Sequence, residues 1–510
     1  MADSTKRHPV ILFPGIAGSR LKTRKKDSQD AHPLWFNGLV LATMNPWSLD
    51  DASAQEVDNL TFSSSSIVES DKSEADLNPS TDWITPSEIW QNHMKLQADG
   101  ITPKVEDNGG EIFNREVEGL DGIRNVHYPL GDNDPDPGSE YYQALVDKLK
   151  ENGYIENEDL IGHPYDWRVA PGGLEKRYQT FTKLKTKIEE LHTKFELPVV
   201  LIAHSMGNRV IQYFLKWVEA NQSRAWIDEH IERYIAISPP WIGSPQAIYR
   251  VSDSAIVLPA GKSQVGLLGM KDVLQSFSSI PWLLPLQDPY FNIPSFGYYK
   301  DGDFNEQDLS KYHAITMQET LEKAGAKETT IAHQTNFYQN DFLITKAKTI
   351  EIGSELIKCP AVNKLDVIYS TGFPTPVGAY YEYKGLLEKR LTIATNLGKE
   401  DPIPYPHKSG LVIKKGIILE TPATEQQIEV EVADGAKLQN SGDLVVPYGS
   451  LTYFKKWQKA EPTRHIVGHE FSAQPTESGG VQYPSVNHNA IVAHPDAITK
   501  IIQLLSESNA

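Results

Sequence analysis

The chain has 510 residues, of which 39% are hydrophobic and 23% charged, and its formal net charge is −18. This length suits one large domain or two smaller ones. The acidic balance excludes a globally basic nucleic-acid-binding surface and disfavours general attraction to an anionic membrane. The single cysteine, Cys359, cannot form an internal disulfide, and its surroundings predict a structural thiol.

The beginning of the sequence carries no recognisable targeting segment. The first eight residues are mostly polar, and the apolar run Val10–Phe13 is too short for the core of a signal peptide. No run of 18 or more apolar residues occurs, so we expect no membrane-spanning helix. These features predict a soluble cytoplasmic protein, or one exported by a leaderless route.

Apolar periodicity alternates between patterns typical of strands and of helices. Continuous apolar runs predict buried strands, and apolar residues three or four positions apart predict helices that cover them. In chain order we expect a strand at 9–13, helices at 139–149 and 178–191, a strand at 198–203, a helix after Ser205, strands at 234–237 and 365–369, and a helix at 498–505. This alternation predicts an α/β fold with a mainly parallel central sheet and helices on both faces.

The remaining segments are expected as additions to a single domain that spans residues 1–510. Its core comprises about 5–25, 125–245, 360–380 and 436–510, and the additions are an insertion at 26–124, a cap or lid region at 245–360 and a β-rich insertion at 380–435. The Ser-, Asp- and Glu-rich part at 50–82 predicts a surface segment. The cap region has few clear strands and many Pro, Gly and aromatic residues. The β-rich insertion is predicted from the runs at 411–413 and 428–432.

The strongest chemical signal is Ser205, in the segment Ala203-His204-Ser205-Met206-Gly207. A nucleophile elbow places a serine on a sharp turn between a buried strand and a helix, and the positions two before and two after it must be small. Ala203 and Gly207 are small, although the GxSxG form has glycine at the first of these positions. Ser205 is therefore predicted to be the nucleophile of an α/β-hydrolase that acts on an ester. An ordinary turn serine is the alternative.

A serine nucleophile needs a histidine base that a carboxylate orients, and in this fold the chain order is serine, acid, histidine. Asp443, in a turn beside an apolar run, fits the acid, and a plain turn aspartate is the alternative. His488, just before the terminal helix, is the preferred base. His494, which precedes Pro495 and fits a helix start, is its rival, and His469 is a weaker third candidate.

The oxyanion that forms during acyl transfer needs two preorganised hydrogen-bond donors. We expect them to be the backbone N–H of Met206, directly after the nucleophile, and that of Ile16, in the loop after the first strand. A tight loop without such a role is the alternative for residues 14–18. The sequence has no HExxH, CxxC or P-loop motif, so neither a metal nor another cofactor is expected, although 15 histidines leave an incidental metal site open.

Several segments, in chain order, resemble those of the lecithin:cholesterol acyltransferase-like lipases, a family of α/β-hydrolases that includes lysosomal phospholipase A2 and phospholipid:diacylglycerol acyltransferases. They extend over most of the chain and comprise residues 9–21, Gly153-Tyr154 followed by Pro164-Tyr165-Asp166-Trp167-Arg168, residues 203–208, the loop Ser238-Pro239-Pro240-Trp241-Ile242-Gly243-Ser244, residues 369–376 and Gly442-Asp443. The sequence departs from the family at Leu444, where glycine or aspartate is usual. It also lacks the cysteines that form disulfides around the lid in the secreted members.

The resemblance implies an acyl-enzyme on Ser205, formed from a glycerolipid in a phospholipase A-like reaction and released to water or to an acceptor alcohol. It also implies that Trp167 and Trp241 bind the substrate and that a mobile lid follows the Trp241 loop. Residues 254–290 are apolar enough to cover acyl chains or to make peripheral contact with a lipid surface, and packing within the cap is the alternative. A serine esterase for non-membrane esters and a non-catalytic binding protein remain the alternative functions. No nucleic-acid partner is expected.

Overall fold

The structure, a computed structural model, describes a defined part of the chain. This part comprises residues 7–25, 32–35, 81–84, 88–107, 112–126, 140–252, 256–260, 263–267, 270–285, 295–300, 308–325, 358–384, 390–399, 402–405, 410–421, 430–431, 437–438, 440–472 and 486–509. Most of the surface segment expected at 50–82 lies outside these residues. Within them, no helix combines the length and hydrophobicity needed to cross a membrane.

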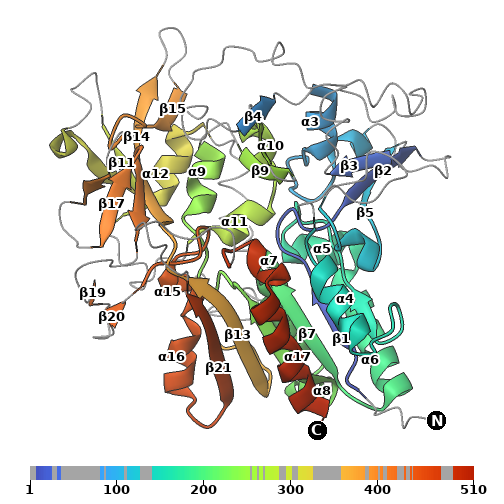
Figure 1. The fold of residues 1–510 in the computed structure, drawn as a ribbon. Coiled ribbons are helices and arrows are strands. Elements are labelled where there is room, and N and C mark those ends of the chain that lie inside the picture. Colours follow the sequence, from blue (N-terminus) through green and yellow to red (C-terminus); the bar gives the residue numbers. More distant parts are fainter. Residues whose placement is uncertain are drawn as a thin grey trace.

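Six parallel strands form the central sheet, in the order β21–β13–β8–β7–β1–β6 (Figure 1). They are β1 (Val10–Phe13), β6 (Leu160–Gly162), β7 (Val199–His204), β8 (Ile231–Ile237), β13 (Lys364–Thr371) and β21 (His465–Ser472). The chain passes from β1 to β6 on one side and then to β7 on the other, so the winding direction reverses between β1 and β7. At such a reversal the loops that follow the strands diverge, and ligands bind in the crevice between them. The α/β-hydrolase class expected from the sequence is confirmed.

Alternate residues of each central strand pack against opposite layers of helices. In β7, Val200 and Ile202 belong to one apolar cluster, whereas Leu201 and Ala203 belong to the other. The first cluster includes residues of α4 (Gln143–Glu151) and α17 (Pro495–Asn509), and the second includes residues of α5 (Pro171–Tyr178), α6 (Thr180–Phe195), α7 (Met206–Asn221) and α8 (Arg224–His230). Because helices cover both faces, the inner strands β1 and β7 are almost entirely apolar.

The predicted core elements are present, with shifts at some of their ends. The helix expected at 178–191 is divided at Gln179, whose left-handed φ of 55° separates α5 from α6. Two central strands were not predicted. β6 has only three residues, and most side chains of β21 are exposed or partly exposed, so neither forms a long apolar run.

The cap region contains more strands than the sequence predicts. Its elements are α9 (Gln246–Ser252), β9 (Ile256–Ala260), β10 (Ser263–Leu267), α10 (Lys271–Leu274), α11 (Ser279–Leu283), β11 (Gly297–Tyr299), η6 (Leu309–Lys311), β12 (His313–Ile315) and α12 (Met317–Lys323). The strands β11 and β12 join a seven-stranded sheet with β14 (Thr375–Lys384), β15 (Arg390–Ile393), β16 (Ile403–Pro404), β17 (Leu411–Lys414) and β18 (Ile417–Glu420). The cap region and the β-rich insertion therefore share one sheet.

Shorter elements complete the described structure. From the insertion at 26–124, β4 (Thr81–Ile84) pairs with β10, and β3 (His32–Trp35) and β5 (Ile112–Glu116) flank β2 (Leu21–Lys25). The others are α3 (Glu88–Met94), η3 (Lys104–Asp107), η4 (Leu120–Gly122), β19 (Val430–Glu431), β20 (Lys437–Leu438), α15 (Tyr448–Leu451), α16 (Phe454–Ala460) and η7 (Ala490–Ala493). The insertion thus contacts both the core and the cap.

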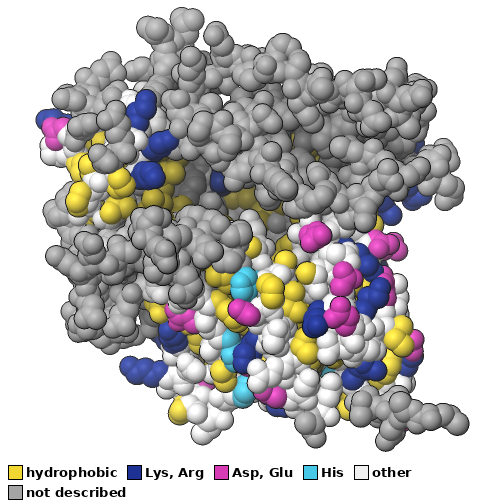
Figure 2. Space-filling view, viewed as in Figure 1, with side chains coloured by type: hydrophobic (Ala, Val, Ile, Leu, Met, Phe, Trp, Pro, Cys, Tyr) yellow, Lys and Arg dark blue, Asp and Glu magenta, His cyan; other side chains and the backbone are white. Residues whose placement is uncertain are grey.

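The described surface on the face shown in Figure 2 mixes both signs of charge. Lys and Arg side chains lie beside Asp and Glu side chains there. A nucleic-acid-binding face instead presents a continuous basic patch. The charge pattern on this face therefore differs from that of a nucleic-acid-binding surface.

Candidate active site

Ser205 lies on a sharp turn between β7 and α7, at the point where the winding of the sheet reverses. Its backbone has φ 52° and ψ −125°, a combination that non-glycine residues rarely adopt and that is typical of a strained functional turn. A Cβ atom on Gly207 would lie 2.5 Å from the carbonyl oxygen of Pro14, and one on Gly15 would lie 2.8 Å from Cβ of Ser205. The loop after β1 and the first turn of α7 are therefore too close for any residue larger than glycine at these two positions.

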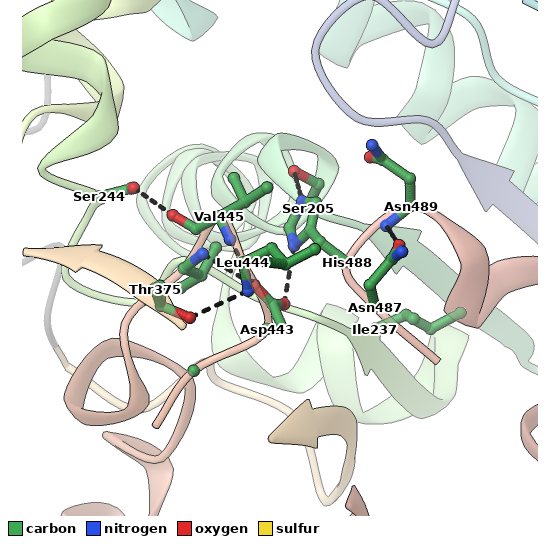
Figure 3. Close-up of polar contacts among 12 residues, drawn as sticks. Ser205, Ile237, Ser244, Thr375, Asp443, Leu444, Val445, Asn487, His488 and Asn489 are labelled. Atoms are coloured by element: carbon green, nitrogen blue, oxygen red, sulfur yellow. Dashed lines mark hydrogen bonds and ion pairs between the residues drawn. The ribbon is translucent and has the colours of Figure 1, made fainter. Parts of the chain in front are cut away.

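Ser205, His488 and Asp443 form a chain of hydrogen bonds (Figure 3). The Oγ of Ser205 lies 2.8 Å from Nε2 of His488, and Nδ1 of His488 lies 2.7 Å from Oδ2 of Asp443. All three side chains are buried, and the backbone N–H of His488 donates to the carbonyl oxygen of Asp443 at 3.0 Å. The structure thus brings together the residues that the sequence proposes as nucleophile, base and acid. With Nδ1–H directed at the carboxylate, the unprotonated Nε2 faces the serine hydroxyl, as a general base requires.

The backbone of its own loop fixes the carboxylate of Asp443. Its Oδ1 accepts hydrogen bonds from the N–H groups of Val446 at 2.8 Å and Val445 at 3.1 Å. These contacts occupy one carboxylate oxygen and leave Oδ2 for His488. The side chain therefore has one defined orientation toward the imidazole.

Two residues of the added sheet anchor this loop. Thr375, the first residue of β14, accepts a hydrogen bond through Oγ1 from the N–H of Leu444 at 2.9 Å. Glu420, the last residue of β18, accepts through Oε1 from the N–H groups of Gly442 and Tyr448, both at 2.7 Å. Burial raises the pKa of Glu420 to about 8. Leu444 has a positive φ of 86°. Glycine and aspartate, which are usual at this position in the family that the sequence resembles, tolerate a positive φ better than leucine does.

The two rival histidines lie outside this chain of hydrogen bonds. His494 follows η7 and directly precedes α17, as its helix-start pattern predicts. His469 lies on β21, where its Nε2 is 2.9 Å from the carboxylate of Asp366 on β13. Among the histidines that the structure describes, His488 is the one within hydrogen-bonding distance of Ser205 Oγ. The geometry therefore favours His488 as the base.

The predicted oxyanion donors lie on the two segments that meet at the elbow. Met206 is the first residue of α7, and the N–H groups of a first helical turn have no acceptor within the helix. Ile16 lies in the loop after β1 and lines the same cavity as Ser205 and His488. The positive end of the α7 dipole would also favour negative charge at this point. The placement suits the roles predicted for both N–H groups, which stay predictions.

A mainly apolar cavity of about 360 Å³ opens at Ser205 and His488. Its apolar wall comes from the loop after β1, the insertion at 26–124, the loop between β6 and α5, the cap region and the acid loop. It includes Ile16, Trp35, Met94, Trp167, Met270, Leu274, Phe277, Ile280, Leu283 and Val446. Polar side chains are fewer and include Glu140, Ser244, Gln246, Arg250 and Asn489. Ligand sites in enzymes commonly have this volume and this predominance of apolar lining.

The two tryptophans expected to bind substrate have different places. Trp167 lines the cavity, and its Nε1–H donates to the carbonyl oxygen of Ser19 at 3.0 Å, which fixes the ring. Trp241 is fully buried and packs edge-on against Trp457 at a centroid distance of 4.9 Å. Its carbonyl oxygen accepts a hydrogen bond from Arg209 of α7 at 2.8 Å. The expected substrate contact of Trp241 therefore has no counterpart among the cavity residues that the structure describes.

The segment at 254–290, expected as a lid, contributes directly to this cavity. Met270, Phe277 and Ile280 are buried and line the cavity wall. Trp282 and Leu284 are also buried in the main apolar cluster. The side chains of β9 and β10, and Leu268, lie outside what the structure describes. The described apolar residues of this segment thus pack inward.

Two buried polar residues beside the site were not singled out from the sequence. His204, which directly precedes Ser205, bonds both to Tyr141 and to the carbonyl oxygen of His488. The position of His204 next to the nucleophile was a usable signal. Tyr141 was recognised only as an apolar helix-face residue, and its hydroxyl gave no pattern in the sequence.

Two other potentially reactive groups lie apart from the site. Burial raises the pKa of the Cys359 thiol to about 12, so it stays protonated near neutral pH, as expected of a structural cysteine. His192, Glu229 and His230 place three potential metal ligands within 4.8 Å of one another on α6 and α8. Glu229 and His230 directly precede β8, so this group lies at the amino end of a central strand, whereas Ser205 follows a carboxyl end.

The chain is similar in sequence to known proteins of one family. The family model described as "Lecithin:cholesterol acyltransferase" matches residues 84–495. The chain is 30% identical over 246 residues to "Lysosomal phospholipase A and acyltransferase" of Rattus norvegicus, covering 48% of this chain and 51% of that protein. It is 30% identical over 233 residues to "Phosphatidylcholine-sterol acyltransferase" of Gallus gallus, covering 42% of this chain and 53% of that protein. The matches therefore span about half the length of these two relatives.

A longer alignment relates the chain to a fungal protein. The chain is 22% identical over 528 residues to "Phospholipid:diacylglycerol acyltransferase" of Schizosaccharomyces pombe, covering 98% of this chain and 73% of that protein. The family model independently covers more than three quarters of the chain. The chain belongs to the lecithin:cholesterol acyltransferase family.

Proposed function

We propose that this chain is a serine acyl hydrolase and O-acyltransferase that cleaves an acyl ester of a glycerophospholipid. The observation that carries the proposal is the hydrogen-bonded chain of Ser205, His488 and Asp443 at the wall of an apolar cavity of about 360 Å³. The names of two relatives, a phospholipase A and acyltransferase and a phospholipid:diacylglycerol acyltransferase, support a phospholipid as the acyl donor.

In the first half of the proposed reaction, Ser205 Oγ attacks the ester carbonyl while Nε2 of His488 takes the hydroxyl proton. Asp443 stabilises the imidazolium that forms. The carbonyl oxygen becomes an oxyanion beside the N–H groups of Ile16 and Met206, and donors at such a site lower the barrier by about 3–4 kcal/mol each. His488 then returns the proton to the leaving alkoxide, so that a lysophospholipid departs and the acyl group stays on Ser205.

The second half repeats these transfers with a new nucleophile. Water or an acceptor alcohol gives a proton to His488 and attacks the acyl carbonyl. The bond to Ser205 Oγ then breaks, and His488 returns the proton to the serine. Water gives a free fatty acid, and an alcohol gives a new ester. The same three residues therefore serve hydrolysis and transfer.

The cavity suits the two ends of a phospholipid. The side chains from the cap, such as Phe277 and Ile280, offer an apolar wall to an acyl chain, and Glu140 and Arg250 supply charge for a polar head group. We include in the proposal a peripheral contact of residues 254–290 with the lipid surface, because Met270, Phe277 and Ile280 of this segment line the apolar wall of the cavity. Such a contact would let an acyl chain pass from the lipid phase to Ser205 without crossing water.

The experiment that tests the function follows the acyl group by mass spectrometry. The purified chain is incubated with phosphatidylcholine and phosphatidylethanolamine vesicles whose two acyl chains differ in length, with and without a long-chain alcohol. We expect one chain length to appear as fatty acid, and as the alcohol ester when the alcohol is present. The variant S205A, which lacks only the hydroxyl, is the control and should form neither product.

The alternatives give different outcomes in the same assay. Hydrolysis of soluble short-chain esters without loss of acyl chains from vesicles would indicate an esterase for non-membrane esters and overturn the lipid substrate. Equal product formation by the wild type and S205A would overturn the nucleophile. Vesicle binding without any Ser205-dependent product would indicate a binding protein.

A further inference from the structure

Two buried side chains, Tyr141 and His204, connect the two halves of the site. Tyr141 precedes α4 and is 7% exposed, and His204 is the last residue of β7 and is 2% exposed. The hydroxyl of Tyr141 lies 2.6 Å from Nδ1 of His204 and accepts a hydrogen bond from the N–H of Gly15 at 2.8 Å. On its other side, Nε2 of His204 lies 2.8 Å from the carbonyl oxygen of His488. Four residues that are far apart in the sequence thus form one line of contacts.

The partners determine where each proton lies. The carbonyl oxygen of His488 can only accept, so Nε2 of His204 carries a proton and donates it. In a neutral imidazole Nδ1 is then an acceptor, and it receives the hydroxyl proton of Tyr141. The Tyr141 oxygen in turn accepts from Gly15. Every donor in the line has an acceptor, and the bonds have a single consistent direction.

The environment of both side chains keeps them neutral. Burial, together with the nearby imidazole of His488, holds the pKa of His204 well below its ordinary value. Burial raises the pKa of the Tyr141 hydroxyl above its ordinary value. The two imidazole rings lie 4.9 Å apart, so a neutral His204 adds no like charge when His488 becomes cationic during catalysis. The arrangement therefore suits both protonation states of the base.

We propose that Tyr141 and His204 are positioning residues that hold the oxyanion loop and the catalytic base at one fixed separation. Gly15 precedes Ile16, the predicted oxyanion donor, and His488 is the predicted base. Ser205 lies between them and is bonded covalently to His204. The line of hydrogen bonds therefore fixes two groups relative to Ser205: the N–H of Ile16, which would bind the oxyanion, and the imidazole of His488, which would accept the proton. This inference rests on the function proposed above for Ser205 and His488.

Fixed geometry matters here because acyl transfer depends on placement within fractions of an ångström. A misplacement of about 1 Å can lower a rate about 10²-fold. Loss of the Tyr141 hydroxyl would remove the donor to His204 and leave the N–H of Gly15 without its acceptor. The loop that carries Ile16 would then be free to shift, although Ser205, His488 and Asp443 would all remain.

The test uses the rate at which a fluorophosphonate labels Ser205. This reaction needs the base and the oxyanion donors but no lipid, because the serine oxygen displaces fluoride from phosphorus. We expect Y141F to lower the labelling rate constant about 10- to 100-fold. The matched control is Y142F, since the buried hydroxyl of Tyr142 also donates one hydrogen bond to a backbone carbonyl, that of Phe13 at 3.0 Å. We expect the labelling rate of Y142F to stay within about twofold of the wild type, although Y142F should lose about as much thermal stability as Y141F.

Two variants of His204 distinguish positioning from simple packing. H204Q keeps one acceptor and one donor that can face Tyr141 and His488, whereas H204L keeps neither. We expect H204Q to restore a substantial part of the labelling rate that H204L loses. Because both residues act through one line of bonds, the double variant Y141F/H204L should label about as fast as H204L alone.

The outcomes separate this inference from the proposed function. Absence of labelling in the wild type would overturn the proposed function itself. Labelling of the wild type with unchanged rates in Y141F and H204L would overturn the positioning role. Equal losses in Y141F and Y142F, or additive losses in the double variant, would also overturn it, because they would indicate independent packing effects.

Discussion

The carboxylate of Glu420 accepts a hydrogen bond at 2.7 Å from the backbone N–H of Gly442, the residue that precedes the predicted catalytic acid. The same oxygen accepts from Tyr448, so it holds both ends of the loop that carries Asp443. Glu420 ends β18 in the β-rich insertion. The insertion is thus connected to the acid loop by a buried carboxyl group and is more than a surface addition.

Replacing Glu420 should loosen the acid loop. In E420A the N–H groups of Gly442 and Tyr448 lose their acceptor, and a buried donor left unpaired costs about 1–3 kcal/mol. We expect E420A to lower the free energy of unfolding by about 2–4 kcal/mol and to reduce turnover. E420Q keeps an acceptor oxygen, so we expect it to retain most of the stability and most of the turnover. Denaturant unfolding and turnover of each variant provide the measurements. E461A, at a surface ion pair with Arg464, is the control and should change neither.

Glu420 should also make stability depend on pH. Burial raises its folded pKa from an ordinary 4.5 to about 8. Between these values the folded protein keeps a proton that the unfolded chain has released. The contribution of Glu420 to the free energy of unfolding is therefore full below pH 4.5 and is lost as pH rises through 8. We expect the wild type to lose on the order of 2–4 kcal/mol relative to E420Q between pH 5 and pH 9. If the free energies of unfolding of the wild type and E420Q changed equally with pH across this range, the raised pKa of Glu420 would be contradicted.

The elbow and the central sheet were predictable because their signals are local. The apolar run before Ser205 and the small residue Gly207 after it lie within a few positions of each other, and the predicted central strands are mostly apolar over four or five residues. The acid and the base were predictable only as ordered candidates. The choice between His488 and His494 required the fold, which brings positions 205 and 488 to 2.8 Å.

Contacts between distant, ordinary residues could not be predicted. Tyr141 and Glu420 belong to no motif, and their roles depend on which backbone groups the fold places beside them. The strands β6 and β21 were missed for a different reason. As the two edge strands of the central sheet they need not be apolar on every residue, so they lack the pattern that identified the inner strands.

The base assignment predicts a large difference between two histidines of the same region. H488A should lower turnover by about 10³-fold or more, because Ser205 loses its proton acceptor. D443N should cost about 10⁴-fold, because the amide would hold His488 in the wrong tautomer. H494A is the matched control and should stay within about threefold of the wild type, as for a substitution away from the site. A large loss in H494A with activity retained in H488A would reverse the assignment.

The close contact at Gly207 predicts that even one methyl group disrupts the site. In G207A the new Cβ would lie 2.5 Å from the carbonyl oxygen of Pro14, a backbone atom that cannot rotate away. The loop with Ile16 must then shift, and we expect turnover to fall about 10- to 100-fold. The control is G410A, which has open space but a φ of 83°, and should cost about 1 kcal/mol of stability without loss of turnover. Comparing turnover with thermal stability for both variants separates displacement of the site from backbone strain.

The buried ion pair of Asp166 and Arg168 joins the core to two of its additions, the insertion at 26–124 and the cap region. Nε and Nη2 of Arg168 bond the two carboxylate oxygens of Asp166 at 2.8 and 2.7 Å, and both side chains are fully buried. Nη1 of Arg168 donates to the carbonyl oxygens of His93 and Met94, which end α3 of the insertion at 26–124. The backbone carbonyl oxygen of Arg168 accepts a hydrogen bond from the backbone N–H of Ser279 in the cap at 3.1 Å. Trp167, between the paired residues, lines the cavity.

Breaking this pair should therefore be costly and should reach the cavity. Burial alone would raise the pKa of Asp166, but the adjacent guanidinium outweighs it and holds that pKa below its ordinary value. R168M would leave Asp166 buried without its partner, and we expect a loss of about 3–5 kcal/mol in the free energy of unfolding. The double variant D166L/R168M should recover part of this loss because no unpaired charge remains. K194M, which breaks an exposed pair with Glu158, should change stability by less than about 1 kcal/mol. An equally small change in R168M would show that the pair contributes nothing to the joint between core, insertion and cap.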